Sequence, residues 1–149
     1  MNNSAGFTLV ELIVTIVLVG ILVGAAIPTF NNVINTTQKQ VNISNMETIK
    51  NTFMQYFYEN HMTGDPHFPP EPENDMMDST YKETQLQDGR TLDNLFNGKA
   101  GLPYNSNGNP YSYYQENDTS STGFVTQRIT IKDMDTDSPS YEENVIGEI

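Results

Sequence analysis

The stretch that decides the fold is Gly6-Phe7-Thr8-Leu9-Val10-Glu11, which opens an apolar run that continues to Phe30. At about 1.5 Å per residue, a helix over residues 7–30 would reach roughly 36 Å, enough to cross a bilayer core of about 30 Å. Glu11 stands near the start of the run, and a carboxylate in lipid is costly unless it finds a partner. The sequence therefore predicts a membrane-length helix whose acidic residue needs to be paired.

This hexapeptide and the run behind it resemble the processing signature of the type IV pilin superfamily, which comprises pilins and the pseudopilins of type II secretion. Gly20 and Pro28 fall where the N-terminal helix of that family has its helix-weakening glycine and proline. The resemblance implies a leader peptide at residues 1–6, cleavage between Gly6 and Phe7 by a membrane-embedded prepilin peptidase, and N-methylation of Phe7. The leader carries no Lys or Arg, whereas leaders of this family usually carry one.

The resemblance also suggests a partner for Glu11. Cleavage would create a positive amine on Phe7, and the Glu11 of a neighbouring subunit would neutralise it. Two charges that are each unfavourable in lipid would then form one pair, which would recruit subunits and set their axial register. The simpler explanation is a glutamate that favours the positive end of the helix dipole or extends to the membrane interface. With the whole signature present, we favour pairing.

The N-terminus allows two other interpretations. A secretory signal peptide needs a basic region before its apolar core, and none is present here. A plain signal anchor needs only the apolar span and stays open as an alternative. The pattern Gly20-x-x-x-Gly24 is either a packing face between membrane helices or a tolerated pair of glycines.

Beyond Pro28 the apolar residues continue at three- and four-residue steps, with polar residues between them. This spacing predicts an amphipathic continuation over residues 31–60, and hence one helix of roughly 80 Å from about Phe7 to about Asn60. Gly64 and Pro66 supply the signal that ends it. We expect the following stripe to be the face on which a small head domain packs: Phe30, Ile34, Val41, Met46, Ile49, Phe53 and Phe57.

Residues 61–149 are predicted to form a globular head with loops and antiparallel strands. The head begins with a long surface loop at residues 66–88, rich in Pro, Asp, Glu and Asn, and residues 91–96 have helical spacing. Pro110–Tyr114 and Phe124–Lys132 are the candidate strands, which we expect to form an antiparallel hairpin on the helix. The predicted fold class is α+β, with the long helix packed on a small sheet in the lollipop form of pilins.

Charge and cysteine content restrict the functions that need considering. From Glu59 onward the chain holds 17 acidic and 5 basic side chains, which account for the whole net charge of −12. Direct binding of nucleic acid through a basic patch is therefore not expected. The chain has no cysteine, so it forms no disulfide. Many type IV pilins close a C-terminal loop with a disulfide, and its absence favours a subunit more like a major pseudopilin.

Candidate chemistry in the head is limited to one acidic stretch. Asp133, Asp135 and Asp137 alternate, and carboxylate oxygens are ligands that calcium prefers. The spacing is not that of an EF-hand, because Ser138 stands at its glycine position and Asn144 at its bidentate glutamate. Major pseudopilins have a calcium site in a comparable C-terminal loop, so calcium is the candidate ligand. The alternative is a solvated acidic loop.

No nucleophile elbow, phosphate-binding loop or dinucleotide motif occurs in the sequence, and no enzyme activity is predicted. We predict a structural subunit of a type IV pilus-like or type II secretion pseudopilus filament, which is a helical homopolymer. The precursor would lie in the bacterial inner membrane with its head outside the cytoplasm, and the filament in the periplasm or at the cell surface. An assembly platform and minor pilins or pseudopilins are the further implied partners. The competing interpretation is a monomeric, membrane-anchored extracytoplasmic binding domain, with calcium as its candidate ligand.

Overall fold

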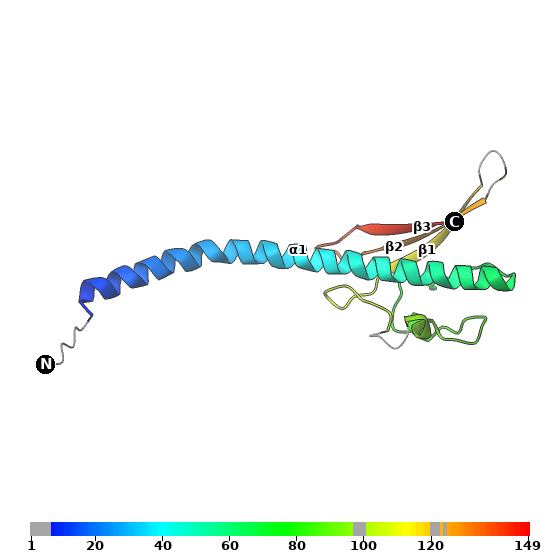
Figure 1. The fold of residues 1–149 in the computed structure, drawn as a ribbon, viewed down its shortest axis with the longest axis horizontal. Helices are drawn as coiled ribbons and strands as arrows, with labels where there is room; N and C mark the ends of the chain where they lie inside the picture. The colour runs from blue at the N-terminus through cyan, green and yellow to red at the C-terminus, as the bar shows by residue number, and fades with distance from the viewer. Residues whose placement is uncertain (1–6, 97–100, 120–122, 124) are drawn as a thin grey trace. The chain divides into compact units, whose positions relative to one another are not determined.

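The computed structural model describes residues 7–96, 101–119, 123 and 125–149. The chain forms two compact units, Met1–Thr37 and Gln38–Ile149, and one helix belongs to both of them. The α+β class predicted from the sequence is confirmed. In chain order the elements are α1 (Leu9–Thr63), the short 3-10 helices η1 (Tyr81–Glu83) and η2 (Leu92–Phe96), and the strands β1 (Ser112–Thr119), β2 (Val125–Lys132) and β3 (Asn144–Glu148) (Figure 1).

Helix α1 ends where the sequence predicts. Gly64 has a φ of 92°, a conformation that glycine adopts without strain. Its N–H donates to the carbonyl of His61, and the N–H of Asp65 donates to the carbonyl of Asn60, both at 3.2 Å. These two bonds form a Schellman motif, which satisfies carbonyls that the helix end would leave unpaired.

The N-terminal unit consists of the exposed part of α1. Every residue from Leu9 to Ala25 is exposed, and the stretch is long and apolar enough to cross a membrane. Soluble monomers rarely expose a continuous apolar surface of this size, because its transfer out of water is strongly favourable. The exposed run therefore fits the predicted membrane span.

In the second unit, α1 buries a stripe that differs in part from the predicted one. Met46, Ile49, Phe53 and Phe57 are buried, as expected, and Tyr56 joins them. Phe30, Ile34 and Val41 are exposed, so the prediction that the packing face begins at Phe30 is wrong. The first fully buried residue of the packing face is Asn42, which lies one helical turn before Met46. One turn earlier, Lys39 pairs with Glu143 of the head, so polar residues make the first contacts of α1 with the head.

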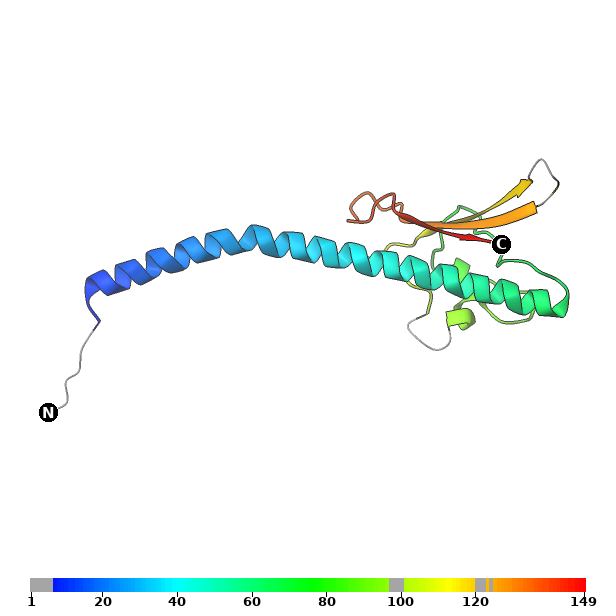
Figure 2. The ribbon, with the colours of Figure 1, turned by 45° about the horizontal axis from the view of Figure 1, so that its top comes forward.

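The three strands form one antiparallel sheet in the order β1-β2-β3. Ile129 of β2 pairs with Gln115 of β1 and with Gly147 of β3. Figure 2 shows the strands along one side of the C-terminal part of α1 and the segment carrying η2 along another. The hairpin predicted from the sequence is confirmed, with β2 at Val125–Lys132; Phe124 lies outside the described residues. The third strand was not predicted.

Aromatic rings join the helix to the sheet and loops. The ring of Phe53 lies 4.9 Å from that of Tyr113, centroid to centroid, in an edge-on arrangement. Phe57 lies 4.7 Å from Phe68, which follows the end of the helix. The hydroxyl of Tyr113 donates to the carbonyl of Pro69 at 2.9 Å. Each large ring that is buried in this way contributes about 1.5–3 kcal/mol relative to exposure, so these contacts hold the head on α1.

Arg90 fastens the loop before η2 to the helix. Its guanidinium donates to Glu59 of α1 at 2.9 Å and to Asp88 at 2.7 Å, and it lies over the ring of Tyr56. Hydrogen bonds from Arg90 and Gln55 lower the pKa of Glu59. All members of this ion-pair cluster are partly exposed, so its contribution to stability is modest.

Candidate functional site

The predicted processing site lies at the start of α1. Gly6, on the leader side of the predicted scissile bond, lies outside the described residues. Phe7 is 80% exposed and precedes the first helical turn. The predicted new N-terminus is therefore accessible on the surface of the chain.

Thr8 and Glu11 form a reciprocal cap at the helix N-terminus. The N–H and the hydroxyl of Thr8 both donate to Oε2 of Glu11, at 2.9 Å and 2.8 Å. The N–H of Glu11 donates back to the hydroxyl of Thr8 at 3.3 Å. This is a capping box, in which a Thr at the cap position and a Glu three residues later each satisfy an N–H that the first turn leaves unpaired.

The capping box gives Glu11 a local partner that the sequence interpretation missed. The signal was available, because Thr8-x-x-Glu11 before an apolar run is the pattern of a capping box. Both bonds from Thr8 go to Oε2, and no bond to Oε1 occurs among the described residues. One carboxylate oxygen thus holds the helix start, and the other can accept a donor from outside the chain.

The two predicted helix-weakening residues both lie inside α1. The helix is continuous through Gly20 and Pro28. A Cβ built on Gly20 would have no atom within 4 Å, so nothing in the single chain requires a glycine there. Proline lacks the N–H that would bond to the preceding turn, so it removes one helical hydrogen bond. The roles predicted for Gly20 and Pro28 in assembly stay predictions.

Asp133, the first of the predicted calcium ligands, lies in a buried polar cluster. Asp133 is fully buried, and its Oδ2 accepts hydrogen bonds from the hydroxyls of Ser138 and Ser140, both at 2.6 Å. Its Oδ1 accepts the N–H of Asp135 at 3.1 Å and the side-chain amide of Asn105 at 3.3 Å. These hydrogen bonds stabilise the buried carboxylate, because its donors replace the hydration that it loses on burial.

Asn42 connects this cluster to α1. Its side-chain amide donates to the hydroxyl of Ser140 at 2.8 Å and to that of Ser138 at 3.0 Å, and its Oδ1 accepts the N–H of Ser106 at 2.8 Å. No buried side-chain nitrogen or oxygen of the described residues lacks a partner. Sequence reasoning did not single out Asn42, since an asparagine in an amphipathic helix gives no signal of its buried partners.

The structure brings two of the three aspartates together. Asp135 shares Asn105 with Asp133, and amide groups of Asn109, Asn107 and Asn105 lower the pKa of Asp135 to about 2. Asp137 is exposed. Within the described residues, no group of three or more acidic, histidine or cysteine side chains is arranged to hold a metal ion. Carboxylate and amide oxygens are nevertheless suitable calcium donors, and calcium at this loop stays a prediction.

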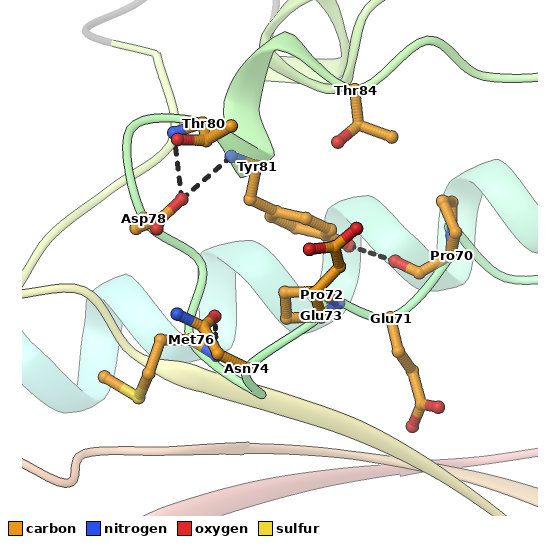
Figure 3. A pocket seen from close by; sticks show the side chains of 10 residues that line it. All are labelled: Pro70, Glu71, Pro72, Glu73, Asn74, Met76, Asp78, Thr80, Tyr81 and Thr84. Carbon is orange, nitrogen blue, oxygen red and sulfur yellow. Dashed lines mark hydrogen bonds between the residues drawn. The ribbon is translucent and has the colours of Figure 1, made fainter.

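One open pocket of about 450 Å³ lies on the head (Figure 3). Tyr81 projects into it and donates its hydroxyl to the carbonyl of Pro70 at 2.5 Å; burial raises the pKa of this phenol, so it stays a donor. Asp78 accepts the N–H groups of Thr80 and Tyr81 and so caps η1. The residues that line the pocket include no histidine, cysteine or basic side chain, and they offer no pair of groups for nucleophilic catalysis.

Comparison with known families gives a match at the same end of the chain as the capping box. Residues 1–27 match the model of the prokaryotic N-terminal methylation motif. Comparison with curated proteins and with solved structures found no match. The matched range includes Gly6, Phe7, Glu11 and Gly20, which carried the resemblance in the sequence. The chain therefore bears the N-terminal signature of the type IV pilins and pseudopilins.

Proposed function

We propose that this protein is a structural subunit of a type IV pilus-like or type II secretion pseudopilus filament. It is cut after Gly6, N-methylated at Phe7 and polymerised through α1. The observation that carries the proposal is the methylation motif on a helix whose apolar surface from Leu9 to Ala25 is uncovered. Such a surface is covered by lipid in the precursor and by other helices in a polymer.

The capping box supports a specific role for Glu11 in assembly. In one subunit, Oε2 of Glu11 holds the helix start through Thr8. Oε1 then accepts a hydrogen bond from the methylated, positively charged amine of Phe7 in a neighbouring subunit. The pair neutralises the carboxylate and the amine in a medium of low dielectric constant. The proposed contact is heterologous, with the amine of each subunit meeting the carboxylate of the next one along the filament, and a heterologous contact can repeat without closing.

The proposed life cycle follows from this arrangement. The precursor is anchored in the inner membrane by α1 with its acidic head outside the cytoplasm, and prepilin peptidase processes it there. An assembly platform with minor pilins or pseudopilins then incorporates it into a filament in the periplasm or at the cell surface. The chain has no nucleotide-binding motif, so the energy for extrusion comes from another component.

Two substitutions separate the capping role of Glu11 from its charge. Glu11→Gln keeps an oxygen that can accept from Thr8 but removes the negative charge. Thr8→Ala removes the capping hydroxyl and keeps the charge, at a helix cost of about 0.5–2 kcal/mol. We expect Glu11→Gln to reduce the filament yield by about tenfold or more, since 1.4 kcal/mol already changes an association constant tenfold. Thr8→Ala should assemble nearly as the unmodified chain does.

The measurement is the amount of sheared filament relative to membrane-bound subunit in the native host, or in one that supplies the assembly machinery. Full assembly of Glu11→Gln would show that the glutamate only caps the helix. If the unmodified chain forms no filament and stays monomeric in the membrane, the tethered binding domain replaces the filament subunit.

A further inference from the structure

The open pocket on the head (Figure 3) carries charge of one sign. Three of the residues that line it have carboxylates, Glu71, Glu73 and Asp78, and none has a positive charge. The chain around the pocket, residues 71–83, holds five acidic side chains and one basic one. A concave surface lined by charge of one sign concentrates the electric field, so the pocket attracts cations.

The cations of this chain do not compensate the three carboxylates. None of the three belongs to an ion pair among the described residues. Glu71 accepts the N–H of Gln115, and Asp78 accepts two backbone N–H groups at the start of η1. These donors are neutral, so they orient the carboxylates and leave their negative charge in place.

Apolar groups form much of the remaining wall. Pro70 and Met76 line the pocket together with Tyr81, which is 5% exposed. Lysine and arginine side chains bury their methylene stems along such surfaces while the charged end stays with polar groups. The volume of about 450 Å³ also lies in the range in which proteins bind small organic groups.

A bare metal ion fits this pocket less well than an organic cation does. Within the part of the chain that the structure describes, no group of three or more acidic, histidine or cysteine side chains is arranged to hold a metal. Carboxylates that are spread around a pocket suit a longer cation with several N–H donors, such as an ammonium or a guanidinium group.

A second copy of this chain is a poor source of that cation. Each copy has a net charge of −12, so two heads repel each other. Four of its basic side chains already pair with carboxylates of their own chain: Lys39, Lys50, Arg90 and Arg128. Charge complementarity therefore favours a different protein that presents a basic segment.

We propose that the pocket binds the lysine or arginine side chain of a basic segment in a second, different protein. The carboxylates accept charge-assisted hydrogen bonds from its ammonium or guanidinium group, and Pro70 and Met76 contact its stem. The attraction between the acidic head and the basic segment also accelerates their encounter. One subunit carries the whole pocket, so this proposal does not depend on the filament function.

Nuclear magnetic resonance of methionine methyl groups tests the proposal on the full chain in detergent. Met76 lines the pocket, and Met134, which lies between two aspartates of another acidic stretch, reports on acidic surface in general. The signal of Met76 is assigned as the one that Met76→Leu removes. The probes are acetyl-Ala-Arg-Ala-amide, its lysine counterpart, and a counterpart with citrulline, which has nearly the shape of arginine without its charge.

We expect the arginine or the lysine peptide to shift the Met76 signal saturably, and the tighter of the two identifies the preferred cation. The citrulline peptide should leave the signal in place, and Met134 should not respond to any probe. Higher ionic strength should weaken binding, because salt screens the exposed carboxylates.

Two matched substitutions locate the binding site. Glu73→Gln removes one exposed carboxylate from the pocket wall, and Glu83→Gln removes one from η1, outside the residues that line the pocket. We expect Glu73→Gln to weaken the peptide about fivefold, as for a favourable ion pair that is partly exposed, and Glu83→Gln to change its affinity by less than about twofold. Thermal unfolding of both variants should match that of the unmodified chain, because both side chains are exposed.

Each contrary outcome overturns the proposal in a different way. Equal shifts with the citrulline peptide would show an apolar pocket without selection for charge. Equal weakening by the two substitutions would show attraction to the acidic head as a whole. No shift with either basic peptide would rule out the pocket as their site. A shift with spermidine at lower concentration than with both peptides would make a free polyamine the ligand instead of a protein.

Discussion

Gly147 marks a close approach between β3 and α1. A Cβ at this position would lie 2.9 Å from Sδ of Met54, 3.1 Å from Cγ1 of Ile129 and 3.3 Å from Cγ of Lys50. Two of these neighbours belong to the helix and one to the central strand, so the glycine lets three elements meet. A glycine in a strand usually weakens it, and here the close packing explains why one is present.

We therefore expect Gly147→Val to destabilise the head by about 1–3 kcal/mol, the usual cost of overpacking a core. Ile146→Val, on the exposed side of the same strand, should change stability by about 0.5 kcal/mol or less. Thermal or urea unfolding of the whole chain in detergent measures both. A Gly147→Val variant as stable as the unmodified chain would show that β3 does not lie this close to the helix.

At the residue scale, the sequence drew attention to single residues but did not predict their contacts. Glu11 stood out because a charge in an apolar run is rare, yet its capping of the helix start also needed Thr8 to be noticed. Asn42 gave no signal, because its partners Ser138 and Ser140 lie almost 100 positions away in the chain. Burial of a polar residue becomes predictable only when such distant donors and acceptors can be placed, which one sequence does not allow.

At the scale of elements, the strength of the local pattern decided what could be predicted. Helix α1 was expected over about 54 residues and spans 55, because its periodicity and its glycine end signal are strong. Within the predicted helical stretch 91–96, Leu92–Phe96 form the 3-10 helix η2, which is shorter and tighter than a regular helix. Strand β1 continues to Thr119, beyond the predicted Tyr114, because pairing with β2 stabilises the polar residues Gln115 to Asp118 as a strand. Strand β3 has only two β-forming residues beside its glycine, and pairing with β2 rather than local preference creates it.

The loop between β2 and β3 is the element on which the calcium prediction depends. If calcium binds there, millimolar Ca²⁺ raises the unfolding temperature, because a ligand that binds only the folded state stabilises it. Mg²⁺ should have a smaller effect, since it prefers a small and rigid octahedral site. Asp135→Asn should remove the Ca²⁺ effect, and Glu116→Gln, on β1, should retain it. An unfolding temperature that is the same in Ca²⁺ and in chelator would identify the loop as a self-contained hydrogen-bonded cluster.

At the scale of the whole molecule, processing is the most direct prediction. Intact-mass and N-terminal peptide mass spectrometry on protein from native membranes should find a chain that begins at N-methyl-Phe7. A chain that begins at Met1 would indicate a membrane tether, and one that begins after Ala26 would indicate secretion. Gly6→Ala should leave the precursor uncut if the bond Gly6–Phe7 is the site, whereas Gly20→Ala should be processed normally.

The hydrogen bonds of Asn42 also bear on the order of folding. They join residues 96 and 98 positions apart, and the ion pair of Lys39 with Glu143 spans 104. Contacts between residues so far apart in the sequence form late in folding. Closing such a long loop costs chain entropy before any contact compensates for it. During synthesis, the buried face of α1 would therefore stay uncovered until the C-terminal segment is available. In this interval the nascent head is open to misassociation, so its folding depends on the residues that are synthesised last.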